Sequence, residues 1–119
     1  MFKDGSIRGY DIVARALAAQ GVEFVFGIVG VPVIELGTAC MEADMNYYGF
    51  RNEQTAGYAA GITGYLTGRP GVCLAVGGPG MTNTISGMAE AMINKRPMIV
   101  VAGASDAVLE GRGAFQELD

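Results

Sequence analysis

Residues 72–102 read VCLAVGGPGMTNTISGMAEAMINKRPMIVVA, with two short apolar runs on either side of a helical pattern. The outer runs, 72–76 and 98–102, have the length and near-continuous hydrophobicity of buried strands. Between them the apolar residues recur at the i, i+3, i+4, i+7 and i+8 spacing of a helix face: Ile85, Met88, Ala89, Met92 and Ile93. A strand, a helix and a second strand of this kind predict a parallel β-α-β unit.

The same alternation extends towards the N-terminus. Helices are predicted over about residues 8–20, 32–42 and 52–67, and strands over 23–28 and 45–49. Gly21 can end the first helix, Pro32 suits the first turn of the second, and Asn52 can cap the third. The predicted fold class is therefore α/β, an open and mostly parallel sheet with helices on both faces.

The last part of the chain lacks this regularity. Residues 103–119 are polar and irregular, and they stop without a closing helix or strand. A length of 119 residues fits one compact domain. We therefore expect residues 1–119 to form a single domain that is truncated at its C-terminal end.

Composition excludes several classes of protein. The net charge is −4 and the eight basic residues are scattered, so nucleic-acid binding is not expected. No apolar run reaches the roughly 18 residues of a membrane span. A secretory signal is not expected, because the sequence does not open on a basic patch followed by an apolar block. Cys40 and Cys73 lack metal-ligand spacing and are interpreted as reduced core residues. An intracellular protein is expected, cytoplasmic or, in a eukaryote, peroxisomal.

Two further features of the composition bear on chemistry and partners. Histidine is absent, which removes Ser–His and Cys–His nucleophiles and most catalytic zinc sites. Catalysis would therefore depend on carboxylates, backbone amides or a cofactor. The mean hydropathy of +0.32 is high for a soluble monomer and indicates apolar surface buried against a partner.

Three loops follow predicted strands, at residues 27–32, 50–54 and 77–80. Open α/β sheets bind ligands at the carboxyl ends of their strands, so these loops are expected to share one edge. Neither glycine loop is a Walker A or a GxGxxG sequence, and a phosphate cradle is not indicated. Their glycines instead favour a close approach of the backbone to a flat ring.

Glu53 is the strongest single candidate for a functional residue, because it lies in the first turn of a predicted helix directly after a strand. From its position alone, an equally good explanation is that the carboxylate only complements the helix dipole. The helix that follows is unusually rich in small residues: Thr55, Ala56, Gly57, Ala59, Ala60, Gly61 and Gly64. Each Gly costs about 1 kcal/mol of helix stability relative to Ala, so close packing is indicated. Either a crowded core or a subunit interface would explain it.

Four motifs now resemble the pyrimidine-binding, N-terminal domain of thiamine diphosphate enzymes, over nearly the whole chain. Residues 50–60, FRNEQTAGYAA, resemble the glutamate segment of these enzymes, and residues 78–83, GPGMTN, their Gly-Pro-Gly-x-x-Asn loop. Residues 114–117, AFQE, resemble the Phe-Gln-Glu segment of the acetolactate synthase and 2-hydroxyacyl-CoA lyase branches. Residues 27–33, GIVGVPV, resemble the Val-Gly-Ile-Pro-Val loop of 2-hydroxyacyl-CoA lyases and oxalyl-CoA decarboxylases.

The details of the resemblance favour the lyase branch. Acetolactate synthases tend to have Pro-Gly-Gly in the first loop, and oxalyl-CoA decarboxylases tend to have Tyr-Glu in place of Phe115 and Gln116. Gly77 departs from the pattern, because the family often has serine there, and this puts one hydroxyl contact in doubt.

The resemblance implies a cofactor shared between subunits. Thiamine diphosphate would lie between this domain and the pyrophosphate-binding domain of a partner subunit, in a homodimer or homotetramer. The partner's domain would hold the diphosphate and magnesium. No Gly-Asp-Gly type metal loop occurs in this chain, so no metal ligands are expected here.

The resemblance also assigns roles to residues. Glu53 would share a proton with a ring nitrogen of the aminopyrimidine, favouring the imino tautomer that deprotonates the thiazolium C2. The ring would be lined by Val29, Gly30, Pro79 and Asn83. The acyl-CoA substrate would meet Val31 and Phe115 and hydrogen-bond to Gln116. Plain core packing explains Val31 and Phe115 equally well.

The implied activity is the cleavage of a 2-hydroxyacyl-CoA to an aldehyde and formyl-CoA. The isolated chain is expected to be inactive, because half of the site is missing. The enzyme alternatives are oxalyl-CoA decarboxylase and acetolactate synthase-type carboligase chemistry. A non-catalytic α/β module that docks a partner or binds a nucleotide remains the alternative from another class.

Overall fold

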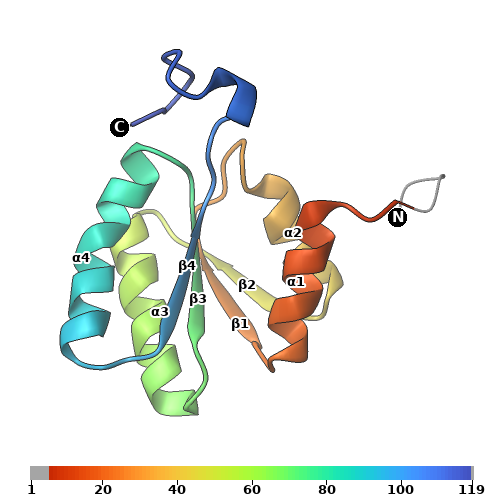
Figure 1. Ribbon diagram of the computed structural model, residues 1–119. Helices are drawn as coiled ribbons and strands as arrows, with labels where there is room; N and C mark the ends of the chain where they lie inside the picture. Colours follow the sequence, from red (N-terminus) through yellow and green to blue (C-terminus); the bar gives the residue numbers. More distant parts are fainter. Residues whose placement is uncertain (1–5, 119) are drawn as a thin grey trace.

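A computed structural model describes residues 6–118 as a parallel sheet with helices on both faces (Figure 1). In chain order the elements are α1 (Gly9–Ala19), β1 (Phe24–Gly27), α2 (Ile34–Glu42), β2 (Asn46–Gly49), α3 (Glu53–Thr67), β3 (Gly71–Ala75), α4 (Pro79–Ile93), β4 (Met98–Ala102) and a 3₁₀ helix (Ala107–Leu109). Helices α1 and α2 pack together on one face, and α3 and α4 on the other. The predicted fold class and order of elements are confirmed; the predicted domain limits, 1 and 119, lie outside the described residues.

The order of the strands creates a switch point in the middle of the sheet. The strands lie in the order β2-β1-β3-β4, and each neighbouring pair is parallel. Val25 of β1 pairs with Tyr47 of β2 on one side and with Val72 of β3 on the other. From β1 the chain therefore adds strands first in one direction and then in the other. In open α/β sheets, ligands bind outside the carboxyl ends of the strands at such a point.

The core explains why β3 is apolar throughout, since helices cover both of its faces. All five of its residues are buried. Val72 and Leu74 belong to a cluster with residues of α1 and α2, whereas Cys73 packs with Ala56 and Ala60 of α3. Cys40 and Cys73 are both buried free thiols, as the sequence predicts. None of the helices in the described part of the chain is long and apolar enough to cross a membrane.

Two helix starts differ from the sequence prediction. Pro32 was expected in the first turn of its helix, but α2 begins at Ile34. The Gly30 carbonyl accepts hydrogen bonds from the amides of Val33 and Ile34, at 2.9 and 3.1 Å, so Pro32 lies in a turn before the helix. Helix α4 begins earlier than expected, with Pro79 in its first turn, where a missing amide hydrogen costs nothing.

The small residues of α3 pack inside the chain. A Cβ built on Gly87 of α4 would lie 2.9 Å from Gly57 Cα, and one built on Gly61 would lie 3.4 Å from Ala91 Cβ. Gly64 lies against the Pro97 carbonyl in the same way. Of the two explanations left open, the crowded core is the one observed. The glycines allow α3 to approach α4 closely.

Candidate functional site

The two glycine loops meet at the switch point, across one side chain. A Cβ on Gly30 would lie 2.5 Å from Val76 Cγ1, and a Cβ on Gly80 would lie 2.6 Å from Val76 Cγ2. Val76 follows directly after β3 and is itself buried. Sequence reasoning missed its role, because it continues an apolar strand pattern and resembles any other core residue. The glycines of the two loops thus pack on opposite methyl groups of the Val76 side chain.

Glu53 lies beside this point, with its carboxylate turned inwards. The residue is only 8% exposed. Asn83 Nδ2 donates a 3.0 Å hydrogen bond to Glu53 Oε2, joining the starts of α3 and α4. A Cβ on Gly80 would lie 3.3 Å from Glu53 Oε1. The structure therefore brings Glu53 together with Asn83, which is 30 residues away in the sequence, and with the glycine loop that precedes Asn83.

A different residue caps the helix. Asn52 Oδ1 accepts hydrogen bonds from the amides of Gln54 and Thr55, at 2.9 and 3.4 Å. This confirms the predicted cap and satisfies the first amides of α3. Because Asn52 already does this, the inward carboxylate of Glu53 is not needed to cap the start of the helix. Capping therefore does not explain why Glu53 is buried.

The floor under Glu53 is apolar and unreactive. Burial raises the pKa of the Cys73 thiol to about 11, and the charge of Glu53 acts in the same direction. The thiol is therefore protonated near neutral pH and cannot serve as a nucleophile. Glu53 is a buried carboxyl group at this edge of the sheet.

The remaining predicted ring contacts lie on the same edge. Val29 is 37% exposed, and its Cγ1 atom lies 3.0 Å from a Cβ built on Gly37 of α2. Pro79 is exposed at the start of α4, one turn before Asn83. With Gly30, these residues surround the switch point from both loops.

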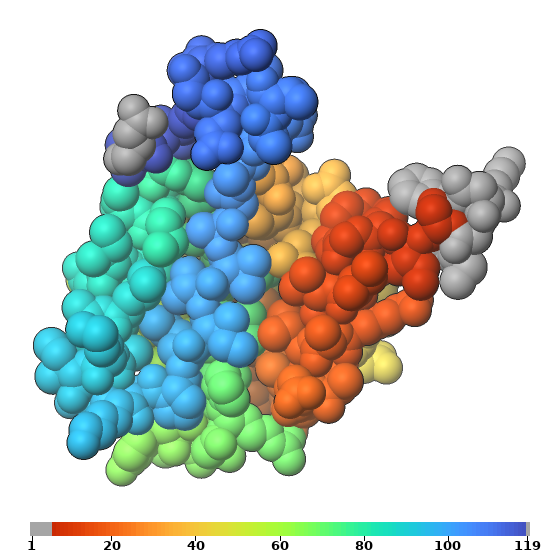
Figure 2. Space-filling model, in the orientation of Figure 1, coloured from red at the N-terminus to blue at the C-terminus, as the bar shows by residue number. Residues whose placement is uncertain are grey.

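The predicted substrate residues form a separate hollow beside the ring contacts. Val31, Phe115 and Gln116 line a cavity of about 400 Å³ between the loop after β1 and the segment after β4. Val31 is 75% and Phe115 78% exposed, so neither packs into the core. Figure 2 shows the segment after β4 lying over the carboxyl edge of the sheet, above the start of α4.

Gly77 has a packing reason for lacking a side chain. A Cβ at this position would lie 2.5 Å from the Gly103 carbonyl oxygen, at the end of β4. Serine does not fit without a backbone shift. The hydroxyl contact that the motif comparison puts in doubt is absent from this loop.

The donor set fits one half of thiamine diphosphate. The missing Cβ atoms of Gly30 and Gly80 let both loops close on Val76, and the buried carboxylate with its amide partner suits a ring nitrogen and an exocyclic amine. Between residues 6 and 118, no group of three His, Cys, Asp or Glu residues gathers as metal ligands. This edge can hold the aminopyrimidine, whereas the diphosphate requires other groups.

Comparison with known proteins agrees with this geometry. Residues 7–119 match the family described as "Thiamine pyrophosphate enzyme, N-terminal TPP binding domain". The chain is 51% identical over 111 residues to 2-hydroxyacyl-CoA lyase 1 of Mus musculus, which covers 93% of this chain and 19% of the relative. It is 46% identical over 114 residues to 2-hydroxyacyl-CoA lyase of Arabidopsis thaliana, covering 96% and 20%. Oxalyl-CoA decarboxylase of Escherichia coli (strain K12) is 39% identical over 113 residues, covering 93% and 20%.

The chain spans about a fifth of the length of these curated relatives. Their names are those of the two branches that the loop at residues 27–33 resembles, which confirms that resemblance. The chain belongs to the thiamine pyrophosphate enzymes and corresponds to their N-terminal TPP-binding domain.

Proposed function

We propose that this chain is the pyrimidine-binding domain of an enzyme that cleaves a 2-hydroxyacyl-CoA to an aldehyde and formyl-CoA. The buried Glu53 carboxylate, bound by Asn83 beside two Cβ-free loops, carries the proposal. The higher identity to the lyases, 51% and 46% against 39% for the decarboxylase, supports the choice of reaction. The pair Phe115 and Gln116 supports the same branch.

Thiamine diphosphate, when bound, supplies the electron sink that allows a bond next to a carbonyl to break. Glu53 holds the proton at a nitrogen of the aminopyrimidine ring. Asn83 orients the carboxylate through its hydrogen bond to Oε2.

The other residues of the edge bind and orient. Val29, Gly30 and Pro79 pack against the ring, and the buried floor of Val76 and Cys73 excludes water below it. Val31 and Phe115 offer exposed apolar surface to the acyl group. Gln116, at the rim of the same hollow, offers an amide to the substrate.

The proposal includes a partner subunit. A second copy of the enzyme, in a homodimer or homotetramer, supplies the pyrophosphate-binding domain with magnesium. Residues 1–119 alone then act as one domain of a longer enzyme and are inactive. The two buried free thiols fit an intracellular location, cytoplasmic or peroxisomal.

Substrate assays on the full-length protein test the reaction. Incubation with a 2-hydroxyacyl-CoA, thiamine diphosphate and magnesium is expected to release an aldehyde and formyl-CoA. Turnover of oxalyl-CoA with release of carbon dioxide, and none of the 2-hydroxyacyl-CoA, would identify the decarboxylase alternative, which the 39% identity supports. Carboligation of pyruvate would identify the acetolactate synthase alternative. No cofactor binding at all would identify a non-catalytic module.

A further inference from the structure

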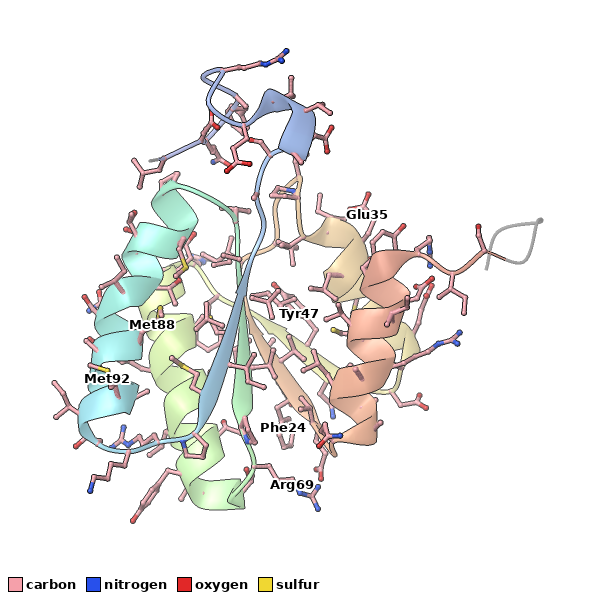
Figure 3. All side chains as sticks on the ribbon, viewed as in Figure 1. Phe24, Glu35, Tyr47, Arg69, Met88 and Met92 are labelled. Carbon is pink, nitrogen blue, oxygen red and sulfur yellow. The ribbon has the colours of Figure 1, made fainter. Side chains whose placement is uncertain are left out.

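Tyr47 joins β2 to the end of β1 through its hydroxyl group. The hydroxyl donates a 2.9 Å hydrogen bond to the Gly27 carbonyl, the last residue of β1. The same carbonyl accepts a second hydrogen bond of 2.9 Å, from the Phe50 amide. Tyr47, on the edge strand β2, is partly buried against the core cluster under α1 and α2 (Figure 3). Its polar end thus reaches the point where the loop after β1 begins.

Burial raises the pKa of Tyr47, whereas the nearby backbone amide of Val29 lowers it. The neighbouring Cys73 raises the pKa further. The phenol is therefore protonated throughout the neutral range, so its hydroxyl can donate the hydrogen bond to the Gly27 carbonyl.

This bridge lies directly before the residues proposed to face the ring. The Gly30 backbone already packs closely on Val76, because a Cβ there would lie 2.5 Å from Val76 Cγ1. Val29 is held sideways by its contact with Gly37 of α2. Tyr47 supplies the third restraint, from the neighbouring strand, and it acts on the backbone rather than on a side chain.

We propose that Tyr47 is a positioning residue, whose hydroxyl fixes the backbone of residues 27–30 so that Val29 and Gly30 meet the aminopyrimidine of thiamine diphosphate. The inference rests on the proposed function, since it is this function that gives Val29 and Gly30 a ring to contact. Tyr47 acts through the loop and is not itself a catalytic residue.

The test is Tyr47→Phe in the full-length protein, with Tyr48→Phe as the matched control. Tyr48 is the next residue, is 49% exposed, and stacks its ring on Phe26 at 5.8 Å. Tyr47→Phe is expected to speed hydrogen exchange of the Val29 amide in the cofactor-free protein by about tenfold. The thiamine diphosphate dissociation constant is expected to rise about three- to tenfold, as for the loss of one buried hydrogen bond. The kcat at saturating cofactor should change less than twofold. Tyr48→Phe should change none of these.

Several outcomes would overturn the proposal. Unchanged exchange at Val29 would show that the hydroxyl does not hold the loop. Faster exchange at Val29 that is matched across the whole sheet would show a merely structural role. Faster local exchange with unchanged cofactor affinity would show that the loop order does not matter to the site. If the wild-type protein bound no thiamine diphosphate, the proposed function would fail, whereas exchange at Val29 would still decide whether Tyr47 orders the loop.

Discussion

Glu53 is a buried residue at the start of a helix, and its hydrogen-bond partner is a neutral amide. The residue is 8% exposed and its carboxylate accepts a hydrogen bond from Asn83, while Asn52 caps the helix. Burial without a cationic partner costs free energy when the group is charged. A ligand that shares its proton would remove this cost, which gives the residue a measurable signature.

Replacing Glu53 by Gln keeps the size and a hydrogen-bonding group but removes the acidic proton. In the full-length enzyme we expect cofactor affinity to change little, because the proposed function assigns the anchoring of the diphosphate to the partner subunit's domain. Exchange of the C2 hydrogen of the bound cofactor for deuterium should slow by about 10²–10⁴-fold, as for lost acid–base help. A helix-dipole role predicts instead a stability loss of about 0.3–1 kcal/mol with normal exchange. Glu42→Gln, at the exposed end of α2, serves as the control.

The close packing of Gly80 against Val76 can be tested by a second substitution. Gly80→Ala would push a methyl group to 2.6 Å from Val76 Cγ2 and 3.3 Å from Glu53 Oε1. We expect a loss of stability of about 1–3 kcal/mol, as for overpacking, and weaker thiamine diphosphate binding. Gly9→Ala, where nothing lies within 4 Å of the added Cβ, should leave the stability unchanged or raise it. Chemical denaturation of both variants measures the difference, and equal midpoints would contradict the packing argument.

At the scale of elements, the segment after β4 is held by a carboxylate rather than by a helix or strand. Glu117 accepts hydrogen bonds from the amides of Gly111 and Ala114, and Ser105 Oγ donates to the Phe115 carbonyl at 3.3 Å. The Gln116 backbone lies against Gly78. This ordering supports the hollow that Phe115 and Gln116 line.

The amides of Gly111 and Ala114 lower the pKa of Glu117, which makes the order of the segment depend on pH. A carboxyl group with a depressed folded-state pKa stabilises above the unfolded value of about 4.3. That contribution is lost as the pH falls through the folded-state pKa. We therefore expect protease sensitivity of residues 105–118 to rise as the pH falls below about 4. Glu117→Gln should show raised sensitivity already at pH 7, and little change with pH.

The sequence predicts helices and strands well where the apolar pattern is regular. It predicts them less well where backbone hydrogen bonds of a loop determine where a helix begins. Helix α3 was predicted with its cap, because Asn52 and the following pattern are local signals. Pro32 was placed wrongly, because the Gly30 carbonyl makes a turn that delays α2. The motifs place Glu53 and Asn83 around one ring, whereas the hydrogen bond between their side chains was not predicted. Val76 and Tyr47 were missed, because the strand pattern predicts only that both are core residues. It does not indicate that Val76 packs against Gly30 and Gly80, or that Tyr47 donates a hydrogen bond to Gly27.

At the scale of the whole molecule, part of the exposed apolar surface lies on α3 and α4. The residues concerned are Ile62, Tyr65, Leu66, Ile85, Met92 and Ile93. The glycines of α3 pack within the chain, so they no longer argue for an interface. The exposed residues and the mean hydropathy of +0.32 still do.

We therefore expect the chain to self-associate at micromolar concentration. Leu66→Lys, at a position that is 75% exposed, should weaken this association with little change in the unfolding midpoint. Thr38→Lys on α2, on the opposite face of the sheet, should leave it unchanged. Sedimentation velocity distinguishes the species. A wild-type chain that sediments as a monomer would remove the support for an interface on these helices.

The strand order has a consequence for how quickly this edge becomes available. Val25 and its partner Tyr47 are separated along the chain by α2, whereas its other partner, Val72, lies beyond α2, β2 and α3. Closing so long a stretch of chain is slow, because its entropy must be lost before the contact stabilises anything. Val76 and Gly80 reach the Gly30 loop only after that closure. The crevice is thus a late product of folding, and a nascent chain that stops before β3 has no place for a ring.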